Sequence, residues 1–390
     1  MSVRTRRGAA RLSLLPGNFF SGMDAAIAAA RAAGVDVIDL SKGSPDQPTP
    51  AHIVAAMQNA VADRRNHGYP GFAGRPALTA AIARRYREDH GVDIDPDAEV
   101  AVFHGSHEAL VASVLAIADP GSAVVVPDPG YPAYRSLAAL AGARVVELPL
   151  RADRGYQPEW AALTPTDRAD AAVLLLNYPH NPTGAVARPE TFPEAVDVAD
   201  ATGSLFVHDF AYSSLGFEGG RPLSALTVAG SRETTVEIST LSKTYNMAGW
   251  RFGYAVGDAA AIAAMRAYQA EAFSTVFGAT HDAAAAALDG SQDAAAELVE
   301  LYRRRRDVVV DGLRGLGWEV AAPEGAFFVW TRVPGGVDDI AFARTALLDH
   351  GVALAPGSGF GPRGTGFVRL GLVQDEDTLR RAVARLGGAS

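Results

Sequence analysis

The chain has 390 residues, of which 48% are apolar and 20% are charged, and its formal net charge at pH 7 is −9. This length and composition predict a soluble protein with a large core and two domains. The negative charge and the lack of a long basic block exclude nucleic acid and anionic membranes as main partners, so a small-molecule enzyme fits better. The absence of cysteine excludes disulfides, thiolate metal sites and cysteine nucleophiles.

The N-terminus shows no clear targeting segment. The first twenty residues carry four arginines and no acid, as in some transit peptides, but no apolar segment of the secretory type follows. No run of about eighteen apolar residues occurs, so no membrane span is expected. We therefore expect a frayed N-terminus and a cytoplasmic location.

The middle of the chain alternates short apolar runs with longer helical patterns, such as 107–118 and 189–203. Several runs are apolar at consecutive positions, as in strands that are covered on both faces of a largely parallel sheet, so the fold class predicted is α/β. The run at 250–257 follows its neighbour too closely for a helical crossover and is expected to be antiparallel. The seven predicted strands lie at 99–105, 122–129, 143–150, 171–179, 204–212, 234–242 and 250–257.

A second, smaller unit with an α+β pattern is predicted toward the C-terminus. A long helix over 292–317 leads into it, and the four arginines at 303–306 are interpreted as a solvated helix face. The predicted division is an N-terminal arm and part of the small domain (1–45), a large domain (46–285) and a small C-terminal domain (286–390). The predicted elements of the small unit are strands at 318–323, 326–333 and 366–373 and helices near 337–350 and 375–387.

Several familiar motifs are absent. The sequence contains no HExxH, GxSxG or GxxxxGK[ST] pattern, so zinc protease, α/β-hydrolase and P-loop functions have no support. The glycine-rich segment 356–367 does not match a dinucleotide-binding motif after a first strand. We interpret it as a flexible loop with turn glycines.

Polar and charged side chains follow three of the predicted strands. Ligands in open α/β sheets gather outside the carboxyl ends of strands, so these side chains are expected to face one crevice. Each alone is a common turn, strand end or solvated lysine, and only their combination in this order is specific. They are Asn181, Asp209, Tyr212, Ser242, Lys243 and Arg251.

The chain resembles the fold-type I, pyridoxal-phosphate-dependent aminotransferases of class I/II from about Leu15 to the C-terminus, and most of all the bacterial branch that contains alanine, methionine and LL-diaminopimelate transaminases. The resemblance implies a homodimer with shared active sites and a large domain with a seven-stranded sheet. It rests on motifs in family order: SKGSPDQPTP (41–50), YPGFAGRPAL (69–78), FHGSHEAL (103–110), PDPGYPAY (127–134), NYPHNPTG (177–184), HDFAY (208–212), TLSKTYNMAGWRFG (240–253), EGAFFVW (324–330) and PGSGFG to GFVRLGL (356–372).

The resemblance assigns roles around the ring of pyridoxal 5'-phosphate. Lys243 forms an imine with the cofactor aldehyde and shuttles a proton, which requires a lysine pKa depressed toward neutrality by burial and other cations. Asp209 keeps the ring nitrogen protonated, so that the ring withdraws electrons from the substrate Cα. Asn181 and Tyr212 bind the phenolic oxygen, and Tyr131 stacks on the ring.

The resemblance also assigns a phosphate cradle. Backbone N–H groups of Ser106 and His107 point at the phosphate from a helix N-terminus. Tyr69 reaches the phosphate from the neighbouring subunit. The remaining phosphate ligands are Thr240, Ser242 and Arg251.

The amino-acid substrate is expected to bind through Arg369, whose planar guanidinium suits the α-carboxylate, beside the small Gly43 and Asn181. A surface arginine paired with an acid is the alternative for Arg369. Lys42 and His107 depart from the usual residues of the family. Lys42 either receives a second negative group of the substrate or extends into solvent, and these two alternatives are equally weighted.

The sequence therefore predicts a transaminase that moves an amino group between an L-amino acid and a 2-oxo acid, without a metal. A specialised biosynthetic enzyme that uses the same Cα carbanion for elimination, replacement, C–C bond formation or decarboxylation is the alternative, because fold and cofactor do not choose between them. A catalytically inactive homologue is disfavoured, because both Lys243 and Asp209 are present.

Overall fold

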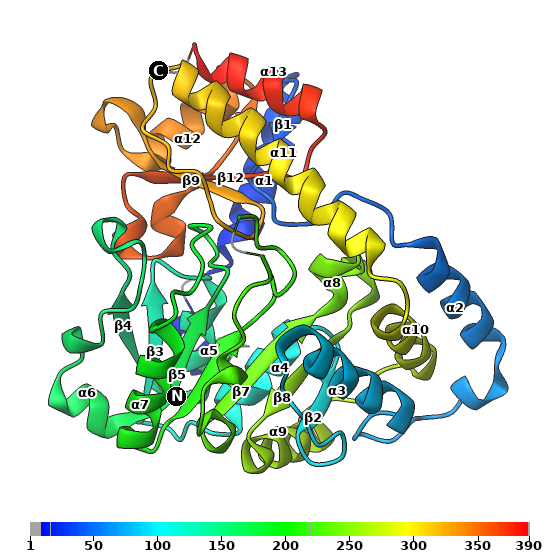
Figure 1. Ribbon diagram of the computed structural model, residues 1–390. Coiled ribbons are helices and arrows are strands. Elements are labelled where there is room, and N and C mark those ends of the chain that lie inside the picture. Colours follow the sequence, from blue (N-terminus) through cyan, green and yellow to red (C-terminus); the bar gives the residue numbers. More distant parts are fainter. Residues whose placement is uncertain (1–8, 16, 219, 389–390) are drawn as a thin grey trace, which may run out of the picture.

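The computed structural model describes residues 9–15, 17–218 and 220–388, so the first eight residues of the expected frayed N-terminus lie outside the described part. The chain forms three sheets and thirteen α-helices within these ranges. Figure 1 shows a large sheet with its helices in the lower part of the view and a smaller unit above it. Every helix in the described residues is too short or too polar to cross a membrane.

The large sheet contains seven strands, as predicted, in the order β2-β8-β7-β6-β5-β3-β4. All neighbours pair in parallel except β8, which is antiparallel to both β2 and β7, so the expected antiparallel strand is confirmed. The strands are β2 (Val100–Phe103), β3 (Ala123–Asp128), β4 (Arg144–Pro149), β5 (Ala171–Asn177), β6 (Leu205–Asp209), β7 (Thr235–Thr240) and β8 (Gly253–Gly257).

Both faces of this sheet are buried, which explains the consecutive apolar residues of its strands. In β3, Val124 and Val126 pack with α4, α5 and α9, whereas Ala123 and Val125 pack with α7 on the opposite face. A third cluster joins α2, α3 and α10 to the β2 and β8 edge. These helices are α2 (Ala51–Ala62), α3 (Pro76–His90), α4 (Ser106–Leu115), α5 (Ala133–Ala141), α6 (Pro165–Asp170), α7 (Thr191–Thr202), α8 (Leu241–Thr244), α9 (Ala259–Ala272) and α10 (Gly278–Asp289).

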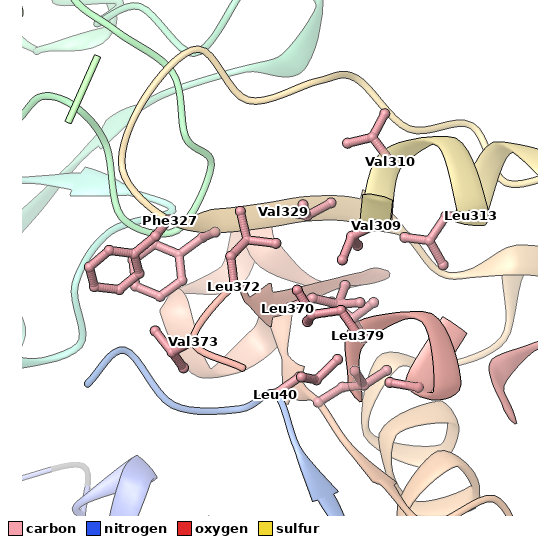
Figure 2. Packing of buried hydrophobic residues seen from close by; sticks show 14 of the residues in the cluster. Leu40, Val309, Val310, Leu313, Phe327, Val329, Leu370, Leu372, Val373 and Leu379 are labelled. Atoms are coloured by element: carbon pink, nitrogen blue, oxygen red, sulfur yellow. The ribbon is translucent and has the colours of Figure 1, made fainter. Parts of the chain in front are cut away.

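The smaller unit has an antiparallel sheet in the order β11-β12-β9 and a parallel pair of β1 with β10. β1 brings the segment before residue 45 onto this unit, and α1 lies beside α12. Its core fills the space between the strands and α11 and α13, and Figure 2 shows Leu40 of the N-terminal segment in that core. The elements are α1 (Phe19–Ala32), β1 (Ile38–Asp39), α11 (Asp293–Gly315), β9 (Phe328–Arg332), α12 (Asp339–Leu348), β10 (Val352–Ala353), β11 (Ala355–Pro356), β12 (Phe367–Gly371) and α13 (Glu376–Leu386).

The predicted strand at 318–323 is wrong, because this segment is irregular and no strand pairs with it. Its carbonyl groups accept hydrogen bonds from side chains instead of a neighbouring strand. The Arg314 guanidinium donates to Val320 O at 2.9 and 3.1 Å, and the Thr331 hydroxyl donates to Glu319 O at 3.2 Å.

The four arginines at 303–306 do not form a uniformly solvated face, so that prediction is also wrong for half of them. Arg305 and Arg306 are buried, because segments distant in sequence pack against this part of α11: Arg305 also donates to Leu372 O at 3.0 Å. Arg305 pairs with Asp46 at 2.8 Å and Arg306 pairs with Glu218 at 2.5 Å, so both charges are compensated.

The glycine-rich segment 356–367 forms turns, as predicted, but they are tightly packed. Two short 3-10 turns bring Gly357 and Gly364 together so closely that a Cβ on either would lie about 2 Å from a carbonyl oxygen of the other. The Asp339 carboxylate accepts hydrogen bonds from the backbone N–H groups of Ser358 and Gly366, which fixes the loop to α12.

Candidate active site

A cavity of about 420 Å³ lies at the carboxyl ends of β5, β6 and β7, where the alternation of strands and helices was expected to place a ligand. It brings together every predicted site residue except Tyr69, whose side chain is 94% exposed on the surface of the same chain. The predicted residues that line it are Lys42, Gly43, Ser106, His107, Tyr131, Asn181, Asp209, Tyr212, Thr240, Ser242, Lys243, Arg251 and Arg369.

Lys243 is presented by the short helix α8 that follows β7. The Thr240 hydroxyl caps this helix, accepting a hydrogen bond from Ser242 N at 3.1 Å and donating to Phe252 O at 2.8 Å. Lys243 Nζ donates to Gly43 O at 2.6 Å. Burial, with the nearby charges of Arg369 and Arg251, lowers the pKa of Lys243 to about 8. The expected depression of this lysine pKa is thus present.

Asp209 ends β6 and is buried. It accepts hydrogen bonds from the Tyr134 hydroxyl at 2.7 Å and from Ala211 N at 3.3 Å. Burial raises the pKa of Asp209, although the Tyr134 hydrogen bond and neighbouring positive charges act in the opposite direction. A cationic partner for this carboxylate would remove the cost of its burial.

Asn177 is a second supporting residue that the sequence prediction missed, like Tyr134. Its Nδ2 donates to Asp209 O at 2.6 Å, and its Oδ1 accepts from Asn181 N at 2.8 Å. The side chain therefore ties the end of β5 to the end of β6. Both residues lie inside quoted motifs. Asn177 ends β5, and that position was the signal that could have found it, whereas Tyr134 lies in α5 and had no such signal.

The start of α4 and Arg251 form one end of the cavity. Gly105 precedes this helix with φ 88°, and a Cβ there would lie 2.6 Å from Arg251 Nη2, so only glycine leaves room for the guanidinium. Arg251 Nη1 donates to Ala248 O at 2.9 Å. Burial and the charge of Arg251 lower the pKa of His107. Free backbone N–H groups and a guanidinium together favour an anion here.

Arg369 lies on β12 and is only 1% exposed. Its Nη1 donates to Asn181 Oδ1 at 2.8 Å and its Nη2 donates to Ser41 O at 2.7 Å, while its buried Nε has no partner. Burial lowers the pKa of Arg369 to about 10. The guanidinium also lies 4.1 Å from the centre of the Phe328 ring.

Helix α1 forms the outer rim of the cavity, which the sequence prediction did not anticipate. Phe20, Met23 and Asp24 project from it into the lining. Lys42 Nζ lies 3.1 Å from Asp24 Oδ1 and 3.5 Å from Asp39 Oδ2. The whole sequence contains two lysines, Lys42 and Lys243, and both line this cavity.

The charges of the inner cavity are unbalanced. Lys243, Arg251 and Arg369 have no carboxylate within 4 Å among the described residues, and Asp209 is the carboxylate that faces them in the inner cavity. Arg369 is buried and Lys243 is half-buried, and cations removed from water without acid partners are costly, so this arrangement, with the exposed Arg251 beside it, fits a site whose ligands supply the negative charge. No group of three or more acidic or histidine side chains in the described residues is arranged to hold a metal ion.

Comparison with known proteins agrees with this chemistry. The family model for aminotransferase class I and II matches residues 35–386. The chain is 45% identical over 376 residues to L-glutamine–4-(methylsulfanyl)-2-oxobutanoate aminotransferase of Bacillus subtilis, covering 96% of this chain and 94% of the relative. It is 44% identical over 380 residues to LL-diaminopimelate aminotransferase of Desulforudis audaxviator, covering 97% of both chains.

Solved structures give the same result. The apo structure of BacF from Bacillus subtilis superposes with a TM-score of 0.95 at 35% identity, covering 98% of both chains. A mutant aspartate aminotransferase from Thermus thermophilus superposes with a TM-score of 0.91 at 32% identity, covering 99% of this chain and 100% of the other. The chain therefore belongs to the aminotransferases of class I and II, and it is a transaminase.

Proposed function

We propose that the cavity holds pyridoxal 5'-phosphate and that the enzyme moves an amino group between an L-amino acid and a 2-oxo acid, with Lys243 as the residue that binds the cofactor and moves the proton. The observation that carries this proposal is the charge of the inner cavity. Lys243, Arg251 and Arg369 lack acid partners among the described residues, and a phosphate plus an α-carboxylate would balance them.

The residues present fit this cofactor. The phosphate would lie against the backbone N–H groups at the start of α4, because the Gly105 position leaves the space beside Arg251 open. Asp209 would bind a protonated ring nitrogen, which would relieve its unfavourable burial. The residues proposed to hold the phosphate are Ser106, His107, Thr240, Ser242 and Arg251, and those proposed to contact the ring are Tyr131, Asn181, Asp209 and Tyr212.

The chemistry supplied by the bound cofactor is electron withdrawal from the substrate Cα. The chain supplies the proton transfer. With a pKa of about 8, Lys243 has a neutral amine in a substantial fraction of molecules near neutral pH, so its Nζ is able to take a proton from Cα and return it elsewhere.

Arg369 is proposed to hold the α-carboxylate of the substrate. Its unpartnered Nε and its neutral partners leave the guanidinium uncompensated until a carboxylate binds. Gly43 is proposed to line the same pocket, and its close packing on Phe328 requires glycine, since a Cβ there would lie 2.8 Å from the Phe328 ring. Lys42 at the rim is proposed to face the distal end of the substrate.

We further propose that the enzyme is a homodimer in which Tyr69 completes the site of the partner subunit. Tyr69 is 94% exposed and Phe72, Phe277 and Val61 are also exposed, which leaves a group of large apolar side chains uncovered. These segments lie together, because Asn66 Nδ2, in the turn that follows α2, donates to Asp282 Oδ2 of α10 at 2.9 Å. A second copy that covers this surface would bring its Tyr69 toward the cavity.

The proposed division of the chain remains 1–45, 46–285 and 286–390. The pairing of β1 with β10 supports the assignment of the N-terminal arm to the small domain. The proposed boundary near residue 285 falls within α10 (Gly278–Asp289), and the start of α11 at Asp293 supports a boundary a few residues later, because α11 leads from the large sheet to the smaller one, as Figure 1 shows.

Spectroscopy of the purified protein tests the proposed function. Addition of pyridoxal 5'-phosphate should produce the visible absorption of cofactor bound covalently to Lys243, and Lys243→Ala should abolish it. An L-amino acid should then shift the absorption and release its 2-oxo acid in equal amount. Covalent cofactor binding without formation of any 2-oxo acid would contradict transamination.

A further inference from the structure

The outer rim of the cavity carries two charged side chains, Asp24 and Lys42, and the nearly buried Asp39 contacts Lys42; we call these three residues the rim cluster. Lys42 lies between the two carboxylates, 3.1 Å from Asp24 and 3.5 Å from Asp39. Asp24 comes from α1, whereas Asp39 and Lys42 come from the segment that leads to Gly43. None of these side chains is used by the proposed transfer of the amino group.

The rim cluster has one positive and two negative charges, so its net charge is −1. Asp39 is fixed and almost buried, because its Oδ1 accepts hydrogen bonds from Ser41 N at 3.0 Å and from the Ser41 hydroxyl at 2.6 Å. Asp24 is 59% exposed on the side chain and Lys42 is 50% exposed, so a ligand is able to contact both. The hydrogen bond that Lys42 donates to Asp24 raises the pKa of Lys42, which is therefore cationic throughout the physiological range.

The composition sharpens this observation. Of the 35 basic residues in the sequence, 33 are arginines, and the two lysines both line the cavity. At position 243 the lysine is required as an amine. At position 42 the compact ammonium of lysine is able to lie between two carboxylates. The planar guanidinium of arginine would instead bind one of these carboxylates bidentately.

The direction of the rim cluster relative to the substrate follows from the inner cavity. If Arg369, which is 1% exposed, holds the α-carboxylate, the side chain of the substrate extends toward the exposed part of the cavity. A distal carboxylate there would have to displace Asp24 from Lys42 and would meet the second carboxylate of Asp39. A distal ammonium would instead find an exposed carboxylate in a region of net negative charge.

We propose that the rim cluster selects amino acids with a positively charged distal end, that is, diamino acids, and that Asp24 is the residue that accepts the distal ammonium. This inference rests on the proposed function, because Arg369 must first fix the α-carboxylate. Lys42 alone would favour a substrate with a negatively charged distal group. Because Lys42 is already paired with two acids, the rim cluster favours a positively charged one instead.

Three probes with the same six-carbon chain and no α-amino group isolate the distal group. Hexanoate, 6-aminohexanoate and adipate each offer one carboxylate to Arg369 and differ only at the other end. Their dissociation constants are measured by calorimetric titration into the cofactor-loaded enzyme, with four- to seven-carbon homologues covering the span of the cavity. We expect 6-aminohexanoate to bind about fivefold more tightly than hexanoate, as for a partly exposed ion pair, and adipate to bind most weakly.

Substitutions assign the preference to the rim cluster. Asp24→Asn should weaken 6-aminohexanoate about fivefold and leave hexanoate within about twofold, whereas Lys42→Met should strengthen the preference for the ammonium probe. Asp119→Asn, which removes an exposed carboxylate outside the cavity, is the matched control and should change none of the three.

Tightest binding of adipate, or an equal effect of Asp24→Asn on all three probes, would overturn the inference. Absence of binding by every probe would overturn the proposed role of Arg369 and with it this inference. Covalent cofactor binding to Lys243 and release of 2-oxo acid from neutral amino acids are measured separately. The proposed transamination therefore stands or fails independently of the rim cluster.

Discussion

The amine of Lys243 lies in the inner cavity with two guanidinium groups and one carboxylate. The charges of these groups influence the pH at which the amine becomes neutral and reactive. Its folded pKa of about 8 lies below the usual lysine value, so the reactive neutral form decreases as the pH falls through 8. The rate of covalent cofactor capture should therefore fall about tenfold per pH unit below pH 8 and reach a plateau above it.

Stopped-flow absorbance between pH 6 and 10.5 measures this dependence. Lys42→Arg is the control, because it keeps the charge at the rim and leaves Lys243 as the only lysine side chain. A rate that keeps rising to about pH 10.5, as for an unperturbed lysine, would contradict the burial argument.

At this scale the sequence predicted the residues that carry the chemistry and missed those that support them. Lys243, Asp209 and Arg369 lie within motifs that are common singly and specific in their combination and order. Tyr134 and Asp24 were missed, because a hydrogen bond to a carboxylate and a position on a distant helix depend on packing that no local pattern records.

Strands β6 and β7 are joined beneath the site by a fully buried pair. His208 Nδ1 lies 2.8 Å from Glu237 Oε1, and Glu237 also accepts hydrogen bonds from the Ser224 hydroxyl and from Ala225 N. Burial acts to raise the pKa of Glu237, but the hydrogen bond and charge of His208 more than offset this effect, so the pKa lies below its ordinary value.

Glu237→Gln should lower the free energy of unfolding by about 3–5 kcal/mol, because it breaks a buried pair and leaves its partners unsatisfied. Asp289→Asn makes the same chemical change in the exposed pair with Arg84 and should cost less than about 1 kcal/mol. Urea unfolding of the two variants gives the comparison. Equal losses of unfolding free energy in the two variants would contradict a special contribution from the buried pair.

The elements predicted correctly and incorrectly differ in how their backbone groups are satisfied. The seven strands of the large sheet are recognisable because both faces are apolar. The segment 318–323 has a similar short apolar composition, but no strand pairs with it in the described residues, and Arg314 and Thr331 bind two of its carbonyl groups, those of Val320 and Glu319. Arg305 and Arg306 are buried because partners distant in sequence supply their acids, and the helical pattern alone contains no sign of those partners.

At the scale of the whole molecule, the proposed dimer predicts complementation between two defective chains. Tyr69→Ala removes the contact given to the partner, and Lys243→Ala removes the reactive amine from its own cavity. A hybrid dimer contains one site with both residues intact. After unfolding and refolding of an equal mixture, activity should reach about a quarter of the native value, because half of the dimers are hybrids with one complete site each.

The assay is run at limiting cofactor, where each variant alone should be weakly active. Mixing without unfolding is the control, since no subunits exchange. Failure of the refolded mixture to exceed the sum of the separate variants would place Tyr69 outside the site. The shared site was predicted only through the resemblance to the family. The residues around an exposed tyrosine do not indicate that it contacts a second subunit.

The confinement of both lysines to one cavity also determines how the protein responds to chemical labelling. Apart from the chain's amino terminus, amine-directed reagents have two targets, the half-exposed Lys42 at the rim and Lys243 within the cavity, since arginine occupies every other basic position. Cross-linkers and amine-coupled supports should therefore react with the intact molecule at its amino terminus and at the rim of the cavity. A lysine-directed label would mark only the two peptides that contain Lys42 and Lys243. Mass spectrometry of these peptides would therefore report whether the active site is occupied, even in a crude mixture.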